Sequence, residues 1–374
     1  MSSSDATRAF SQNLTVEKLQ ELVDMSDILV RNTPEEYKLL TENILKAAFR
    51  RELYTNLREC EQLVLKDNIE DIGKTVYDIL DETISGYSRS EEIPDFGDKI
   101  EFLWQDIESH QVGMCGIPFF INSLNEFVTL ERGELVVVAA PAKGGKSMFM
   151  LDSAVHALRS GETVMYIDSE LSDRLFLCRM VSYLTGIEFN AIKHGRYGEA
   201  ERDEIKNALS WLKNRKFVHL YMPIFDQKGL YLAVKKIYNR YDGLGLLIVD
   251  YLKSTGDTDA FATYQELGRL TDLIKNDICG AMNIPGLAAA QLTANAALAD
   301  SRKIARNAST IITITDKTPE EREADGEECG TKKLFVQFNR NGMQMAQGEY
   351  IDLNFDGNRI AFSEAKQHIP QQPY

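Results

Sequence analysis

A lysine and a serine, Lys146 and Ser147, stand where a short β-branched run passes into a segment with helical apolar spacing. In such a strand, loop and helix, backbone N–H groups at the helix start hold phosphates. The lysine reaches the terminal phosphates, and the serine hydroxyl holds magnesium. A glycine-rich turn without function is the alternative interpretation. The predicted nucleotide-binding residues of this phosphate loop are Ala140, Pro141, Ala142, Lys143, Gly144, Gly145, Lys146 and Ser147.

Two other apolar runs end in carboxylates. Asp250 directly follows the run Leu246–Val249, and an acid at the carboxyl end of a strand is what a second magnesium-side ligand requires. The run Thr163–Ile167 leads into Asp168 and Glu170, either of which could orient and polarise an attacking water. We favour Glu170 as this base and keep Asp168 as its rival. An aspartate in an ordinary turn and an acid that caps a helix are the alternatives.

An amide and a guanidinium complete the set of candidate residues. Gln291 ends the predicted buried strand Pro285–Ala290, where its amide could contact the γ-phosphate or its water. Arg340 lies in the predicted turn Asn339–Gly342, and an arginine at such a tip can stabilise transition-state charge in a neighbour's site. A glutamine at an ordinary strand end and a solvated turn arginine are the alternatives.

From Gly133 onward, short β-branched runs alternate with helical segments. This alternation predicts a mostly parallel, doubly wound α/β sheet with ligands at the carboxyl ends of its strands. The last two runs are joined through Gly342 and Gly348, which predicts an antiparallel hairpin at one edge. The predicted strands are Leu135–Ala139, Thr163–Ile167, Phe217–Tyr221, Leu246–Val249, Pro285–Ala290, Thr310–Ile314, Lys333–Phe338 and Tyr350–Phe355.

The region before this domain has helical patterns and no strand signals. Thr33 and Pro34 provide an N-cap and a first helical residue for one long helix through Val64. Further helices are predicted over Val16–Met25, from Asn68 and over Lys99–Ser109, with a linker over Ser85–Asp98. We expect a disordered tail (1–14), a helical N-terminal and linker-helix region (15–90), an α/β ATPase domain (91–365) and a flexible tail (366–374).

Composition limits the class of protein. A formal net charge of −15 argues against a monomer that coats DNA with one broad basic face, although a ring can confine positive charge to loops in its channel. Apolar runs stay short of the ~20 residues that a membrane span needs, and the N-terminus lacks the apolar centre of a signal peptide. The 5 cysteines are far apart and odd in number, which fits a reducing compartment. We expect a cytoplasmic protein without a membrane partner.

Several segments, in this order, resemble the hexameric replicative DNA helicases of the DnaB type, a RecA-like branch of the phosphate-loop ATPases. That family's first motif characteristically begins with alanine, so Ala140 supports the resemblance, which covers roughly Lys99 to Phe362. The segments are GIPFFINSLNEF, VVAAPAKGGKS, YIDSEL, LGLLIVDYLKS, AAAQL, DSRKIARNASTIITIT and QFNRNG.

The resemblance implies a homo-hexameric ring that uses ATP and Mg2+ to translocate on single-stranded DNA and to unwind duplex DNA. It implies Glu170 as the water-activating base, Gln291 as a sensor and Arg340 as a finger that reaches the adjacent subunit. Lys146 and Ser147 would contact phosphate and magnesium, with Asp250 as the second magnesium-side acid. Loops after the Asp250 and Gln291 strands would grip DNA phosphates through cations, of which we select Lys253, Arg302, Lys303 and Arg306. Solvated loops are the alternative.

Three departures from the family pattern bear on this transfer. Phe338 stands where the family usually has a lysine, two residues before the finger. The N-terminal region is short, which would suit a phage or mobile element in a bacterial or phage-infected cell. A zinc-binding or primase segment is absent from the sequence, so we expect a separate primase, and a separate helicase loader. Two alternatives stay open: a RadA-like recombination or branch-migration ATPase, and a non-catalytic ATP-binding scaffold of a replication complex.

Overall fold

The computed structural model describes residues 34–65, 69–88, 96–109, 116–224, 227–252, 260–292, 301–346 and 348–368. The chain divides into two compact units, Met1–Phe102 and Leu103–Tyr374. The helix predicted over Val16–Met25 and the predicted tail 1–14 lie outside the described residues. Where the structure describes the chain, no helix combines the length and the apolar character that crossing a membrane requires.

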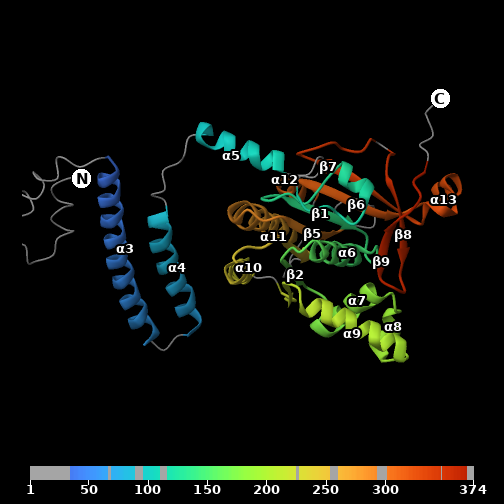
Figure 1. Cartoon of the computed structure of the whole chain (residues 1–374), viewed down its shortest axis with the longest axis horizontal. Coiled ribbons are helices and arrows are strands. Elements are labelled where there is room, and N and C mark those ends of the chain that lie inside the picture. Colours follow the sequence, from blue (N-terminus) through green and yellow to red (C-terminus); the bar gives the residue numbers. More distant parts are fainter. Residues whose placement is uncertain are drawn as a thin grey trace, which may run out of the picture. The chain divides into compact units, whose positions relative to one another are not determined.

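The first unit contains a pair of helices, α3 (Pro34–Val64) and α4 (Ile69–Ser88), drawn in blue in Figure 1. As predicted, α3 begins at Pro34 and continues through Val64. The two helices pack through a hydrogen bond from Asn56 Nδ2 to Thr83 Oγ1 of 2.6 Å, and Thr83 and Cys60 are buried between them. Helix α5 (Phe96–Ser109) begins three residues earlier than predicted, and α4 includes Ser85–Ser88, so both helices extend into the predicted linker.

The second unit is built on a nine-stranded sheet with the order β3-β2-β4-β5-β1-β6-β7-β8-β9. Pairing is parallel from β3 through β6 and antiparallel from β6 through β9, so the mostly parallel α/β prediction is confirmed. The predicted hairpin is antiparallel, but the unpredicted β9 lies outside it at the edge. The strands are β1 (Leu135–Ala140), β2 (Val164–Asp168), β3 (Phe217–Tyr221), β4 (Leu246–Asp250), β5 (Gly286–Gln291), β6 (Thr310–Asp316), β7 (Lys332–Asn339), β8 (Ile351–Asp356) and β9 (Ala361–Glu364).

Helices cover both faces of this sheet (Figure 1). Strand β1 is buried on both sides: Val136 and Val138 belong to one apolar core, and Leu135 and Val137 belong to the other. The first core includes α6 (Lys146–Arg159) and α7 (Asp173–Thr185), on which α8 (Phe189–His194) and α9 (Glu199–Lys213) pack. The second includes α10 (Gln227–Tyr241), α11 (Ala260–Asp272), the π-helix η2 (Leu273–Gly280) and α12 (Ser301–Asn307). Short elements are η1 (Asn122–Glu126), α13 (Pro319–Asp325) and η3 (Glu327–Cys329).

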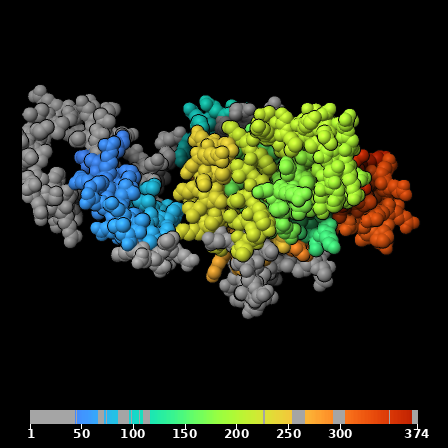
Figure 2. Space-filling view, turned by 90° about the horizontal axis from the view of Figure 1, so that it is seen from below, coloured from blue at the N-terminus to red at the C-terminus, as the bar shows by residue number. Residues whose placement is uncertain are grey.

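The C-terminal strands contact elements that lie far from them in the sequence. The N–H of Phe189, at the start of α8, donates to the carbonyl oxygen of Asn358 (2.9 Å), and Figure 2 shows yellow-green and orange surfaces meeting in this part of the molecule. We predicted a frayed tail from Lys366, but its first residues are held in place. Lys366 pairs with Glu328 (2.7 Å), and His368 Nδ1 lies 2.7 Å from the buried Asp352. Residues 369–374 lie outside the described part of the chain.

Candidate active site

The predicted phosphate loop lies between the end of β1 at Ala140 and the start of α6 at Lys146. The loop closes through a hydrogen bond from Gly144 N–H to Pro141 O of 2.9 Å, and Lys143 has a positive φ of 62°. Gly145 has φ 97°, and a Cβ there would lie 2.6 Å from the ring of Phe362. Both the backbone angle and the space therefore require glycine at residue 145.

The structure brings Lys146, Ser147 and Asp250 together. The Ser147 hydroxyl donates to one oxygen of the buried Asp250 carboxylate (3.2 Å), and the Tyr166 hydroxyl donates to the other (2.7 Å). The Lys146 ammonium lies 4.8 Å from the centre of the Tyr251 ring. A hydroxyl beside a carboxylate at a helix start is a set of hard oxygen donors, which is what Mg2+ prefers, so these residues fit a magnesium ion.

The Asp250 carboxyl is buried, and its pKa responds to that burial. Desolvation, together with the nearby Asp168, raises the pKa of Asp250 to about 6. Hydrogen bonds from Tyr166 and Ser147 and the charge of Lys146 act in the opposite direction. A bound cation would favour the ionised form of this group.

The two rival acids after β2 have different surroundings. Asp168 is only 1% exposed, and its Oδ1 accepts the backbone N–H groups of Glu170 and Leu171, each at 2.7 Å. Glu170 is exposed, and the pKa of Tyr251 is raised first by burial and then by the negative charge of the nearby Glu170. The Asp168 carboxylate therefore holds the backbone of the turn after β2 through hydrogen bonds, whereas the Glu170 carboxylate is accessible to solvent.

Gln291 lies beside the phosphate loop. It ends β5 in register with Ala140, and the next residue, Leu292, donates its N–H to Ala140 O (2.9 Å). The Gln291 side chain is exposed. The carboxyl ends of β1, β2, β4 and β5 thus place the predicted lysine, serine, acids and amide on one edge of the sheet.

Arg340 lies at the opposite edge. Its N–H donates to Ser309 O (2.8 Å), and the Ser309 N–H donates to the carbonyl oxygen of Leu135, the first residue of β1 (2.9 Å). The guanidinium is exposed and donates to Arg306 O (2.8 Å). Because strands rise about 3.3 Å per residue, the length of β1 separates Arg340 from the phosphate loop by roughly 16 Å. Within one chain, Arg340 is therefore not brought to Lys146.

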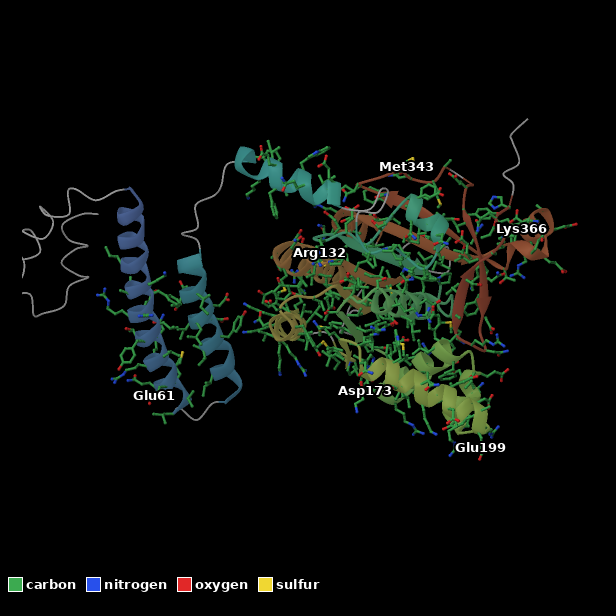
Figure 3. The ribbon with its side chains drawn as sticks, in the orientation of Figure 1. Glu61, Arg132, Asp173, Glu199, Met343 and Lys366 are labelled. Carbon is green, nitrogen blue, oxygen red and sulfur yellow. The ribbon has the colours of Figure 1, made fainter. Side chains whose placement is uncertain are left out.

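The turn that holds Arg340 is rigidly hydrogen-bonded. Buried Asn339 donates to Phe127 O (2.8 Å) and to Met343 O (3.2 Å), and it accepts from Thr310 (3.1 Å). Figure 3 places Met343, in this turn, on the side of the domain away from Asp173 at the start of α7. Phe338 stands where the resemblance predicts a lysine. Its side chain packs against the apolar core and carries no charge for a phosphate.

Of the four predicted DNA-binding residues, the structure describes the side chain of one. Lys253 and the side chains of Arg302 and Lys303 lie outside the described residues. Arg306 is exposed at the end of α12.

Sequence reasoning missed two residues that contact the site, Tyr166 and Tyr251. A tyrosine inside the apolar run of β2 was an available signal, because a buried hydroxyl needs a hydrogen-bond partner.

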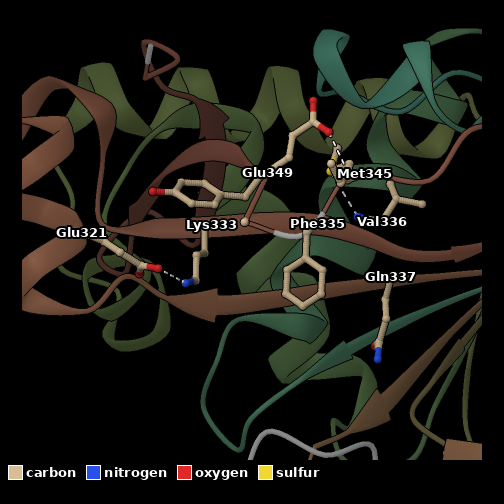
Figure 4. A pocket seen from close by; sticks show the side chains of 10 residues that line it. Glu321, Lys333, Phe335, Val336, Gln337, Met345 and Glu349 are labelled. Atoms are coloured by element: carbon tan, nitrogen blue, oxygen red, sulfur yellow. Dashed lines mark hydrogen bonds and ion pairs between the residues drawn. The ribbon is translucent and has the colours of Figure 1, made fainter. Parts of the chain in front are cut away.

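A pocket of about 370 Å3 lies along β7, separated from β1 by β6, and it contains none of the predicted site residues. In Figure 4 the side chains of Lys333, Phe335 and Gln337 extend from the same side of the strand, and Lys333 pairs with Glu321. Its walls are formed by Glu321, Lys333, Phe335, Val336, Gln337, Met345, Ala346, Gly348, Glu349 and Tyr350.

The sheet order and the strand, loop and helix from β1 to α6 define the fold class, a mostly parallel α/β sheet of the RecA-like type. The chain belongs to the DnaB-like helicase C terminal domain family, whose model matches residues 116–364. This match includes every predicted site residue.

Curated relatives include replicative helicases. The chain is 20% identical over 290 residues to the replicative DNA helicase DnaB of Helicobacter pylori (strain ATCC 700392 / 26695), covering 75% of this chain and 59% of that protein. It is 24% identical over 286 residues to a probable plasmid replicative DNA helicase of Chlamydia psittaci, covering 72% and 60%. The chain thus matches about three fifths of the length of these relatives.

Two solved structures share the fold. One is a DnaB-like replicative helicase described with its interactions with primase, with a TM-score of 0.68 at 14% identity over 87% of this chain and 77% of that one. The other is a separately solved ATPase domain, with a TM-score of 0.64 at 14% identity over 74% of this chain and 100% of that one.

Proposed function

We propose that this chain is an ATP-dependent replicative DNA helicase that works as a homo-hexameric ring on single-stranded DNA. The observation that carries the proposal is the separation of two groups of residues by the length of β1. Lys146, Ser147, Asp250 and Glu170 lie at one edge of the sheet, and Arg340 lies at the other. A site completed by a neighbour's arginine needs a ring or filament of subunits.

In this proposal, residues 140–147 hold the phosphates of ATP, with Lys146 on the terminal phosphates. Ser147 and Asp250 hold Mg2+, which would neutralise charge on the phosphate oxygens. Glu170 accepts the proton of the attacking water, a role that its exposed carboxylate can fill. Gln291, next to Ala140, contacts the γ-phosphate or its water and relays the nucleotide state to the segment after β5.

Helix α5 supports the proposed ring. Five of its large apolar side chains are at least half exposed in the single chain, which is unusual for a soluble helix unless a partner covers it. They are Phe96 (71%), Ile100 (50%), Phe102 (73%), Trp104 (57%) and Ile107 (56%). The proposed partner is the ATPase domain of an adjacent subunit.

The remaining roles belong to the same proposal. Lys253, Arg302, Lys303 and Arg306 contact DNA phosphates in the channel. A separate primase and a separate loader act with the ring in the cytoplasm. The proposed division is a tail (1–14), a helical and linker-helix region (15–90), an ATPase domain (91–365) and a C-terminal segment (366–374) whose first residues are held by Glu328 and Asp352.

A forked-duplex assay tests this function. With ATP and Mg2+, the chain should unwind a fork that carries single-stranded tails, and single-stranded DNA should stimulate its ATP hydrolysis. ATP hydrolysis without unwinding would favour a recombination-type motor. Binding of ATP without any hydrolysis would favour a scaffold.

A further inference from the structure

A histidine on the edge strand β3 lies behind the turn that presents Glu170. In the parallel register of β2 and β3, His219 pairs with Tyr166, so both side chains lie on the same face of the sheet as Asp168. His219 Nε2 is 3.8 Å from Asp168 Oδ2. Both of these atoms are buried and lack a hydrogen-bond partner in the described structure.

The other ring nitrogen has a partner. His219 Nδ1 lies 2.7 Å from Asp173 Oδ1, at the start of α7. A nitrogen this close to a carboxylate oxygen carries the proton that it donates. The Phe176 ring stacks on the imidazole at 3.9 Å between centroids and fixes its plane. The orientation of the ring is therefore set from one side by Asp173 and from one face by Phe176.

The imidazole lies between two carboxylates. Nδ1 has its partner in Asp173, and Nε2 faces Asp168 Oδ2 at 3.8 Å, which is longer than a hydrogen bond but leaves the ring packed against that side of the carboxylate. The ring therefore limits rotation of the Asp168 carboxylate on this side.

The charged and titratable groups around His219 come from three described elements. Strand β2 contributes Asp168 and Tyr166, and α7 contributes Asp173 and Arg179, whose buried Nε has no partner and whose charge acts on Tyr166. Asp250 of β4 lies behind Tyr166, at 2.7 Å from its hydroxyl. Asp168 and Asp173 thus flank the imidazole, and Arg179 lies on the same helix as Asp173.

Asp168 connects His219 to the proposed base. Its Oδ1 already accepts the N–H groups of Glu170 and Leu171 (2.7 Å each), so fixing Oδ2 fixes the whole carboxylate and the turn attached to it. We propose that His219 is a positioning residue for ATP hydrolysis, whose imidazole, oriented by Asp173 and Phe176, packs against Asp168 and so holds the turn that carries Glu170. The inference rests on the proposed function, in which Glu170 is the base.

The test compares ATP hydrolysis by the full chain with that of His219→Leu and His219→Gln. We expect kcat of His219→Leu to fall about 10- to 100-fold, because small displacements of a catalytic group have effects of this size. KM for ATP should stay within about 3-fold, because the phosphates are held by residues of β1 and α6. His219→Gln, which can still donate one hydrogen bond to Asp173, should retain part of the activity that His219→Leu loses, whereas a role in packing alone would give both variants the same loss.

Two further variants keep the inference falsifiable. The Asp173 side chain is 83% exposed, so Asp173→Asn should fold normally. This substitution should lower kcat when made in the wild type, but it should lower kcat little further when combined with His219→Leu. Val218→Ala, on the opposite face of β3, is the matched control and should keep the wild-type kcat. An unchanged kcat, a loss confined to KM, or equal losses in the two His219 variants would overturn the inference. If Glu170→Gln hydrolyses ATP normally, the proposed base is wrong instead.

Discussion

The two edges of the parallel sheet differ in what they can do alone. At the carboxyl edge, Ser147, Asp250 and Tyr166 are joined by hydrogen bonds of 3.2 and 2.7 Å, and Lys146 lies against Tyr251. At the other edge, Arg340 sits in a turn fixed by Asn339, with its guanidinium exposed and bonded only to a backbone oxygen among the described contacts. The first edge is assembled within one chain, whereas the second presents a cation that has no phosphate site of its own.

Lys146→Ala should produce the largest effect at the carboxyl edge. Without the ammonium on the terminal phosphates, ATP hydrolysis should fall at least about 10³-fold, because charge stabilisation of phosphoryl transfer is lost. Steady-state phosphate release measures this. Lys206→Ala, an exposed lysine on α9, is the control and should hydrolyse ATP as the wild type does. Normal ATP hydrolysis by Lys146→Ala would contradict the prediction that residues 140–147 form a phosphate loop.

Asp250→Asn should weaken activity while it stabilises the fold. Loss of the magnesium-side carboxylate should lower hydrolysis about 10²-fold. In EDTA and without nucleotide, the variant should be about 3 kcal/mol more stable at pH 7.5, because the native state no longer buries a charge.

The pH dependence of this stability follows from the sign of the shift. Because the pKa of Asp250 is raised to about 6 in the folded state, its neutral form stabilises the wild type at low pH. That contribution is lost as pH rises from about 4 to about 6 and is constant above. Thermal unfolding of both proteins across this range should show the wild type losing stability relative to Asp250→Asn. A constant difference at all pH values would contradict the burial argument.

Ile107→Glu on α5 should have the smallest effect on the chain itself. The residue is 56% exposed, so the unfolding temperature of the ATPase unit should not change. In the proposed ring, each contact should weaken by about 2 kcal/mol, the value of burying one such side chain. Native mass measurement with ATP should then show smaller assemblies, whereas Glu101→Gln, an exposed polar control on α5, should assemble normally. Full assembly of Ile107→Glu at the same concentration would contradict this role of α5.

Local patterns predicted the strands around the site because each is a continuous apolar run followed by a turn. Leu246–Val249 before Asp250 is such a run, and so is Leu135–Ala139 before the loop. Strand β9 escaped prediction because it has only four residues (Ala361–Glu364). Its place is set by distant contacts instead: Phe362 packs on Gly145 and donates its N–H to buried Asp152 (2.7 Å).

The positions of the candidate site residues at strand ends could be predicted from motifs, whereas contacts that depend on the pairing of strands could not. Glu170 and Asp168 were indistinguishable in sequence, because both follow the same run. Only the fold shows that Asp168 is buried and used by the backbone while Glu170 is exposed. His219 gave no signal, because its nearness to Asp168 depends on the register of β2 and β3.

The central claim is that finger and base come from different subunits, and mixing two inactive variants tests it directly. Arg340→Ala keeps Glu170, and Glu170→Gln keeps Arg340, so each alone should lose at least about 10³-fold in ATP hydrolysis. Mixed rings contain interfaces with both intact residues, and we predict that DNA-stimulated hydrolysis returns in proportion to their number. If the mixture stays as inactive as its components while native mass measurement detects mixed rings, a finger supplied by the neighbouring subunit is ruled out.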